Sequence, residues 1–175
     1  VVTVAALAVA GWRGWGWYQG NKAAQAAVVY EQLREAAAAR NVDKVREAAG
    51  TLFASYRSTA YGQMGALVAA HAYAGAGDAK AARAALEGAV SNARDEAFRS
   101  AARLRLAALL LDEKAYDEGL KVLQTGGEGS YAGEFADRRG DLLVAQGKQA
   151  EARSAYRQAL EALAPDSALR RVVQL

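Results

Sequence analysis

The stretch that most restricts the fold runs from Tyr131 to Pro165, because its small and large residues follow an order that suits two tightly crossed helices. Gly147 stands where a first helix must end, since the residue after a helix often turns left-handed and glycine does so without a Cβ penalty. A second helix then runs from Lys148 to Ala164, and Pro165 cannot continue it. The stretch therefore predicts an antiparallel helical hairpin. Its crossing positions are Gly140, Leu143, Gly147, Ala152, Tyr156 and Ala159.

The same turn recurs upstream at a regular interval. Each turn is followed five positions later by a mostly small residue, in the pairs Gly147 with Ala152, Lys114 with Gly119, Gly77 with Ala82 and Arg40 with Val45. The turns lie 37, 37 and 33 residues apart, close to the period of about 34 residues of a tetratricopeptide repeat. One hairpin cannot bury its own apolar stripe, so such repeats stack into a solenoid. The chain is predicted to hold three to four helical hairpins.

Composition supports an all-α fold and argues against several kinds of function. The 175 residues are 53% hydrophobic, include one proline and show no strand-like alternation. The net charge of +3 comes from 22 basic and 19 acidic residues interleaved along the chain, a pattern of solvated surface and not of a nucleic-acid site. The chain has no cysteine, which excludes disulfides and thiolate chemistry. No cofactor and no nucleic-acid partner is expected.

Residues 1–12 carry no charge. As a helix they would span about 18 Å, whereas the core of a bilayer is about 30 Å thick. We therefore expect residues 1–20 to be the C-terminal part of a transmembrane helix that begins before Val1. A buried core helix and a signal-peptide core are the alternatives, although the small-x-small cleavage pattern of a signal peptide is missing. The predicted contacts with the membrane interface are Trp12, Arg13, Trp15, Trp17 and Tyr18.

Glycines follow the apolar run and lower its helix propensity. Gly11, Gly14, Gly16 and Gly20 predict a flexible collar next to the membrane, with a helix-dimer face at Gly16-x-x-x-Gly20 as the alternative. The orientation stays open at this point. Positive charges after the apolar run alone favour a cytoplasmic exit by the positive-inside rule, but charges upstream of residue 1 would decide.

The repeat domain is predicted to occupy residues 21–175. Apolar periodicity and turn signals divide it into paired helices and a short last helix that covers the open end of the stack. Asn41 and Asp43 are predicted to supply a turn and an N-cap, and Asp78 is predicted to cap the second helix of the next hairpin. The predicted pairs are 21–40 with 45–56, 63–76 with 78–93, 96–112 with 116–123 and 131–147 with 148–164, followed by a helix through Leu169, Val172, Val173 and Leu175. The glycine-rich loop at residues 124–130 follows no strand and lacks the Gly-Lys-Ser/Thr ending of a phosphate-binding loop.

Four segments, in order along the chain, resemble the YfgM-type ancillary subunits of the bacterial Sec translocon. They are Gly11-Trp12-Arg13, Tyr61-Gly62, Leu104-Arg105-Leu106-Ala107, and Ala136-Asp137-Arg138-Arg139-Gly140 running on to Gly147 and Ala152-Arg153-Ser154-Ala155-Tyr156. The resemblance implies one transmembrane helix in the cell inner membrane and a tetratricopeptide-like domain in the periplasm. It also implies two partners, the SecY channel complex and a membrane-anchored periplasmic chaperone of the prolyl-isomerase type.

The inventory of chemical groups favours binding over catalysis. His71 is the only histidine, so no histidine cluster can hold zinc, and no nucleophile motif accompanies it. Asp137 and Asp141 lie four apart beside Arg138 and Arg139, which indicates an ion-pair face more than a catalytic carboxylate pair. The chain is predicted to be no enzyme and to have no metal site.

A protein-binding groove is the expected site, because by resemblance the first helix of each hairpin lines the concave face. The lysine and asparagine of a carboxylate clamp are absent at these positions, and their apolar and acidic character suits a helix or an extended hydrophobic segment. Burial of some of them in the core is the equally open alternative. The predicted function is a non-catalytic adaptor of the translocon that binds the chaperone; the alternative is a bracing subunit of another inner-membrane complex. The predicted groove residues are Met64, Leu67, His71, Leu104, Ala108, Asp137 and Asp141.

Overall fold

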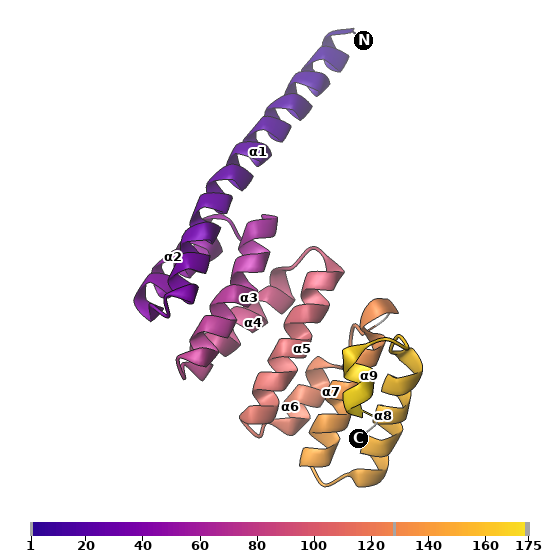
Figure 1. The fold of residues 1–175 in the computed structure, drawn as a ribbon. Coiled ribbons are helices and arrows are strands. Elements are labelled where there is room, and N and C mark those ends of the chain that lie inside the picture. The colour runs from indigo at the N-terminus through magenta and orange to yellow at the C-terminus, as the bar shows by residue number, and fades with distance from the viewer. Residues whose placement is uncertain (1, 128, 174–175) are drawn as a thin grey trace. The chain divides into compact units, whose positions relative to one another are not determined.

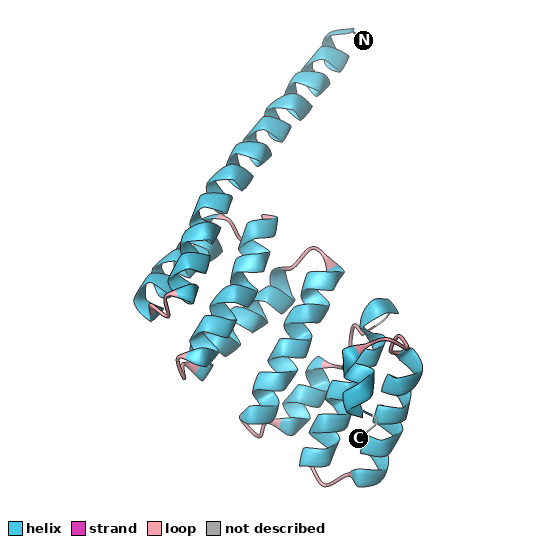
Figure 2. Cartoon of the chain, viewed as in Figure 1, coloured by secondary structure: helices cyan, strands magenta, loops and turns pink. Residues whose placement is uncertain are grey.

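Helices succeed one another through residues 2–127 and 129–173, the part of the chain that the computed structural model describes (Figures 1 and 2). None of these residues lies in a strand, so the all-α prediction is confirmed. A 3₁₀-turn, η1 (Gly129–Tyr131), precedes the seventh helix. The helices are α1 (Val2–Ala38), α2 (Val42–Ser55), α3 (Ala60–Gly75), α4 (Ala79–Asn92), α5 (Glu96–Asp112), α6 (Tyr116–Val122), α7 (Ala132–Ala145), α8 (Gln149–Ala162) and α9 (Ala168–Val173).

The four predicted turns all adopt the left-handed conformation. The φ angles are 52° at Arg40, 79° at Gly77, 61° at Lys114 and 78° at Gly147. The residues five positions after these turns, Val45, Ala82, Gly119 and Ala152, are all buried. Equivalent positions of the repeat alignment therefore play equivalent roles at all four turns.

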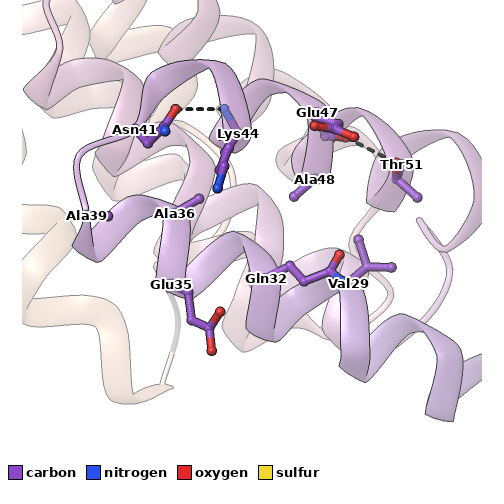
Figure 3. A pocket seen from close by; sticks show the side chains of 10 residues that line it. All are labelled: Val29, Gln32, Glu35, Ala36, Ala39, Asn41, Lys44, Glu47, Ala48 and Thr51. Atoms are coloured by element: carbon purple, nitrogen blue, oxygen red, sulfur yellow. Dashed lines mark hydrogen bonds between the residues drawn. The ribbon is translucent and has the colours of Figure 1, made fainter.

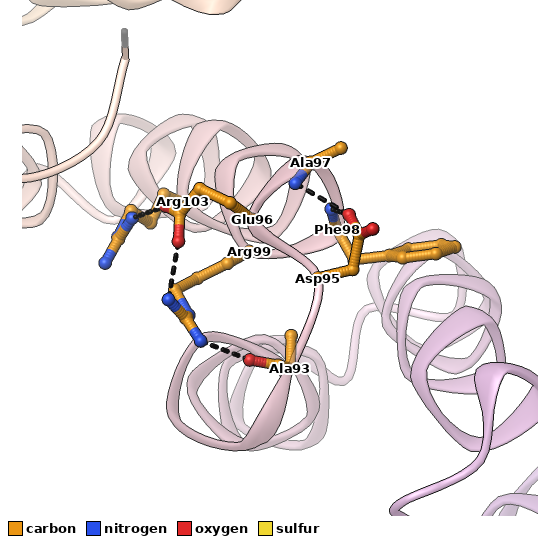
Figure 4. Close-up of polar contacts among 7 residues, drawn as sticks. All are labelled: Ala93, Asp95, Glu96, Ala97, Phe98, Arg99 and Arg103. Atoms are coloured by element: carbon orange, nitrogen blue, oxygen red, sulfur yellow. Dashed lines mark hydrogen bonds and ion pairs between the residues drawn. The ribbon is translucent and has the colours of Figure 1, made fainter.

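Side-chain caps start several of the helices. The predicted cap at Asp78 is confirmed, because Ala81 N donates to Asp78 Oδ1 at 3.0 Å. Of Asn41 and Asp43, Asn41 caps α2, and Lys44 N donates to its Oδ1 at 3.1 Å. At the start of α5, Ala97 N and Phe98 N donate to Asp95 Oδ1 at 2.8 and 3.2 Å (Figure 4). Each such cap satisfies backbone donors that the helix leaves unpaired and contributes about 1 kcal/mol.

The chain divides into two compact units, residues 1–85 and 86–175. In the first unit, α1, α2 and α3 pack on one another. Leu33 and Leu52 are fully buried among alanines such as Ala69. Figure 1 shows the N-terminal half of α1 extending beyond the other helices of this unit.

The predicted collar is wrong, because α1 runs without a break from Val2 to Ala38. Each glycine inside a helix costs only about 1 kcal/mol relative to alanine. Ending a helix leaves several backbone groups unpaired, and restarting it requires a new nucleus. Isolated glycines between helix-compatible residues are therefore retained inside α1.

Among the described residues, no helix combines the length and the apolar character that crossing a membrane requires. Two positions of the predicted terminal helices, Val1 and Leu175, lie outside the described residues.

In the second unit, α5, α6 and α7 surround a core of Ala107, Leu123, Phe135 and Leu142, and α8 pairs with α7. The predicted last helix is present as α9. It packs Leu169 and Val173 against Ala136, Ala159 and Leu163. Its Arg170 guanidinium donates to the Leu160 and Leu163 carbonyls at the end of α8, where a positive charge is favourable.

Gly140 on α7 faces the ring of Tyr156 on α8. A Cβ at Gly140 would lie 2.6 Å from Tyr156 Cδ1, far inside van der Waals contact. By contrast, a Cβ at Gly88 on α4 meets nothing within 4 Å. The two glycines therefore separate the effect of packing from the effect of helix propensity.

We expect Gly140→Ala to lower the free energy of unfolding by about 1–3 kcal/mol, because the ring must move out of a packed crossing. The control Gly88→Ala should raise it by about 0.5–1 kcal/mol, since alanine is the better helix former. Urea denaturation of both variants and the parent measures the two changes. Equal effects of the two substitutions would contradict the tight crossing.

Candidate functional site

The aromatic residues of α1 are strongly exposed. Trp12, Trp15, Trp17 and Tyr18 have 78%, 63%, 75% and 52% of their surface open, and Arg13 is exposed between them. The Trp15 and Tyr18 rings lie 6.0 Å apart between centroids. Large aromatic side chains that are exposed together mark a contact with something outside the chain. The predicted membrane contact of these five residues stays a prediction.

Three predicted groove residues lie on α3 in the first unit. Met64 and Leu67 are half-buried, and His71 is exposed. Their spacing of three and four residues puts them on one side of the helix. They therefore form a row with an open imidazole at its C-terminal end.

His71 also lines a cavity of about 500 Å³. The cavity lies where the end of α1, the start of α2 and the end of α3 come together. Arg40 and His71 are the two ionisable side chains in its lining, and the remaining lining is small and apolar. The lining residues are Ala37, Arg40, Val42, Val45, His71, Ala72, Gly75 and Ala76.

A second cavity, of about 490 Å³, lies between α1 and α2 (Figure 3). Its lining mixes small apolar residues with both signs of charge, from Glu35, Lys44 and Glu47. Two of its polar residues are already engaged locally, because Asn41 caps α2 and the Thr51 hydroxyl donates to the Glu47 carbonyl. It contains none of the predicted groove residues.

The predicted groove residues of α5 lie in the second unit and are half-buried. Leu104 packs against the core cluster formed by Ala107, Leu123, Phe135 and Leu142. Ala108 lies one turn further along the helix. Leu104 therefore contributes to the core as well as to the surface, which answers for this residue the question that the sequence left open.

Asp141 on α7 is held by two internal donors. The Tyr156 hydroxyl donates to its Oδ1 at 2.9 Å, and the Arg138 guanidinium donates to its Oδ2 at 2.9 Å. Both carboxylate oxygens are thus occupied within the α7–α8 hairpin. The predicted ion pair is present, but it is partly buried and not fully solvated.

Asp137 lies one turn before Asp141 and has a different electrostatic environment. Burial, followed by the negative charge of Asp141, raises the pKa of Asp137 to about 6, while Arg138 acts in the opposite direction. The pKa of Tyr156 is also raised, first by burial and then by its hydrogen bond to Asp141. The hairpin therefore holds a carboxyl group that resists ionisation below neutral pH.

His71 and the acidic side chains of these surfaces form no metal-ligand cluster in the described part of the chain. Within residues 2–127 and 129–173, no group of three or more histidine, cysteine or acidic side chains could hold a metal ion. His71 has small apolar neighbours and a guanidinium in its cavity, and the lining offers no nucleophile.

The sequence did not indicate the roles of two residues at these surfaces, Arg40 and Tyr156. The repeat alignment marks Arg40 only as a turn residue. An arginine at a position where two other repeats have glycine is nevertheless a signal in the sequence that this side chain has a further role. Tyr156 was recognised only as a packing residue, and its hydroxyl bond to Asp141 depends on the crossing of α7 and α8. The place of Arg40 in the cavity and the hydrogen bond of Tyr156 both depend on packing between helices, which spacing within one helix does not reveal.

Comparisons with known proteins point in one direction. Residues 1–175 match a family model described as a tetratricopeptide repeat-like domain. An ancillary SecYEG translocon subunit of Neisseria gonorrhoeae is 37% identical over 90 residues, which cover 51% of this chain and 43% of that protein. An ancillary SecYEG translocon subunit of Escherichia coli is 30% identical over 150 residues, 85% of this chain and 71% of that protein. The match thus spans less than half of one relative and about 70% of the other.

The raised pKa of Asp137 makes a pH-dependent prediction. A carboxyl group with a pKa of about 6 in the fold and 3.8 as its ordinary value stabilises the fold below pH 3.8 and loses this contribution as pH rises to about 6. Asp137→Asn keeps a neutral side chain at every pH. We expect it to match the parent near pH 4 and to be more stable by about 1 kcal/mol above pH 6, a modest gain because the carboxyl is half-exposed.

Urea unfolding of both proteins between pH 4 and pH 8 measures this difference. A constant difference across that range would show that Asp137 does not titrate where its surroundings place it.

Proposed function

Because this chain belongs to the YfgM-type family of tetratricopeptide repeat-like proteins, we propose that it is a non-catalytic subunit of the bacterial Sec translocon that holds other proteins near the channel. The names of its relatives support the association with SecYEG. The finer role, as an adaptor that brings a periplasmic prolyl-isomerase-type chaperone to the channel, rests on the resemblance of the sequence.

The observation that carries the proposal is the continuity of α1. One helix bears the exposed aromatic residues near its start and supplies Leu33 and Ala36 to the core of the repeat domain near its end. Indole and phenol rings favour the level of lipid headgroups, and Arg13 can reach the same level with its charge. We infer that this part of α1 lies at the inner membrane, with the repeats on the periplasmic side.

The row Met64, Leu67 and His71 is the proposed contact for the chaperone in the first unit. Half-buried apolar side chains next to an exposed polar one suit an amphipathic helix or an extended segment, with the apolar groups giving affinity. In the second unit, the half-buried Ala108 and Asp137 are the candidates for contact with a partner. Leu104 and Asp141 act there mainly by supporting the surface.

The position of α1 gives the first functional prediction. A photo-crosslinking amino acid in place of Trp15, in the full-length protein in native membranes, should capture subunits of the SecY channel complex. The same label at the exposed Gly50 of α2 is the control for random collisions. Capture of only unrelated membrane proteins from position 15 would count against the translocon assignment.

The row Met64, Leu67 and His71 gives the second functional prediction. Leu67→Glu places a charge in the apolar row and should reduce co-purification of the chaperone about tenfold or more, because a carboxylate loses hydration in an apolar contact. Ala84→Glu adds the same charge at an exposed position of α4 and should leave the yield of chaperone unchanged. Thermal melting of both variants checks the fold. If Leu67→Glu instead causes the whole membrane complex to dissociate, the chain braces that complex and is not an adaptor.

A further inference from the structure

We propose that the cavity beside His71 binds an acidic peptide segment of a partner protein, with Arg40 and His71 contacting a carboxylate and the small apolar lining contacting a neighbouring apolar side chain. This inference rests on the proposed function, since it names the chemistry of one segment that the chain would hold. It adds a charged contact to a surface that the sequence predicted to be apolar and acidic.

The size and lining of the cavity suit a peptide side chain and a flanking charge. Its volume of about 500 Å³ falls within the range of about 300–1,000 Å³ that ligand pockets have. Ala37, Val42 and Ala72 give apolar walls, whereas Arg40 supplies a positive charge and His71 an imidazole donor. An Arg guanidinium carries a permanent charge and a fork of donors that fits a carboxylate, and an imidazole N–H adds a directed donor.

The acidic residues near the cavity share one arginine as their partner. Asp43 follows Val42 of the lining, and Asp78 comes shortly after Ala76. Arg46 bridges both carboxylates, with N–O distances of 3.2 Å to Asp43 and 3.5 Å to Asp78. Both acids are engaged by Arg46, which is not part of the lining, so Arg40 remains the permanent positive charge of the lining itself.

The ends of α1 and α3 bring partial negative charge to the cavity and the start of α2 brings partial positive charge, so the side chains of the lining must select the charge of a ligand. The carbonyl groups near the end of α3 are engaged, because Ala76 N donates to the Ala72 and Tyr73 oxygens at 3.1 Å and Gly77 N donates to the Ala74 oxygen at 3.0 Å. The start of α2, at Val42, brings the positive end of a helix dipole to the same place.

A peptide fits this place better than a lipid headgroup. From Tyr18 to Ala37, α1 spans about 30 Å at 1.5 Å per residue. If the aromatic residues of α1 lie at the membrane interface, the cavity stands far above the headgroups. An anionic segment of a protein can reach it there, whereas a lipid phosphate cannot.

The turn geometry supplies a clean variant for the test. Arg40 has a φ of 52°, a conformation that glycine adopts more readily than arginine. Arg40→Gly therefore removes the guanidinium without harming the turn. Lys114, with a φ of 61°, is the equivalent turn residue of the third hairpin, so Lys114→Gly removes a cation from the same kind of turn elsewhere.

The test uses the full-length protein and a fluorescein-labelled peptide of alternating leucine and glutamate, followed by fluorescence anisotropy. The parent should bind this peptide, and binding should weaken as salt is added. Arg40→Gly and His71→Ala should each weaken binding about tenfold, as expected for the loss of a charged hydrogen bond. Lys114→Gly should bind like the parent, and a peptide with glutamine in place of glutamate should bind at least tenfold more weakly.

Several results would overturn the inference. They are no binding of the acidic peptide by the parent, equal binding of the glutamine peptide, and unchanged binding by Arg40→Gly. Vesicles of anionic phospholipid that bind through Arg40 while the peptide does not would show a lipid site instead. Crosslinking from position 15 tests the proposed function separately from the cavity. If Arg40→Gly and the parent both capture the channel but neither binds the peptide, only the assignment of the cavity fails.

Discussion

Close contact between helices at small residues is the constraint on which the rest of the structure depends. Gly140 lets the Tyr156 ring lie against α7, and Gly65 of α3 lies against the Leu52 side chain of α2, where an added Cβ would come within 2.5 Å of Leu52 Cδ1. Much of the core consists of alanine, which removes little apolar surface from water per residue. Tight crossings compensate through dispersion contacts, which weaken quickly when helices separate. The same closeness brings the Tyr156 hydroxyl to Asp141 and so creates the polar network of the α7–α8 hairpin.

The repeat pattern made most of the fold predictable from sequence. A turn followed five residues later by a buried position is a local signal, and it located all four left-handed turns, including Arg40 and Lys114, which are not glycine. The path of α1 was not predictable in this way. Helix propensity treats each glycine alone, whereas the helix persists because stopping it would leave backbone groups unpaired.

The binding surfaces were less predictable, for a physical reason. Spacing along a helix tells which side chains share a face, but it does not tell what a neighbouring helix presents to them. Leu104 was placed on the groove face, and it also packs on the core because α6 and α7 reach it. Asp141 shares a face with Asp137, yet only Asp141 meets a hydroxyl. Arg40 was a turn signal in the sequence and became part of a cavity only when α3 was folded against α1 and α2.

The continuity of α1 has a consequence for how such a protein could act. A flexible collar would let the repeat domain sample many distances from its anchor, which would dilute any bound segment over a large volume. A helix that runs unbroken from the aromatic residues into the repeat core instead fixes the distance between anchor and cavity at about 30 Å. A partner held at His71 and Arg40 would then stand at one height above the aromatic residues. The glycines of α1 remain helical at a small cost in stability, and the unbroken helix keeps that distance constant.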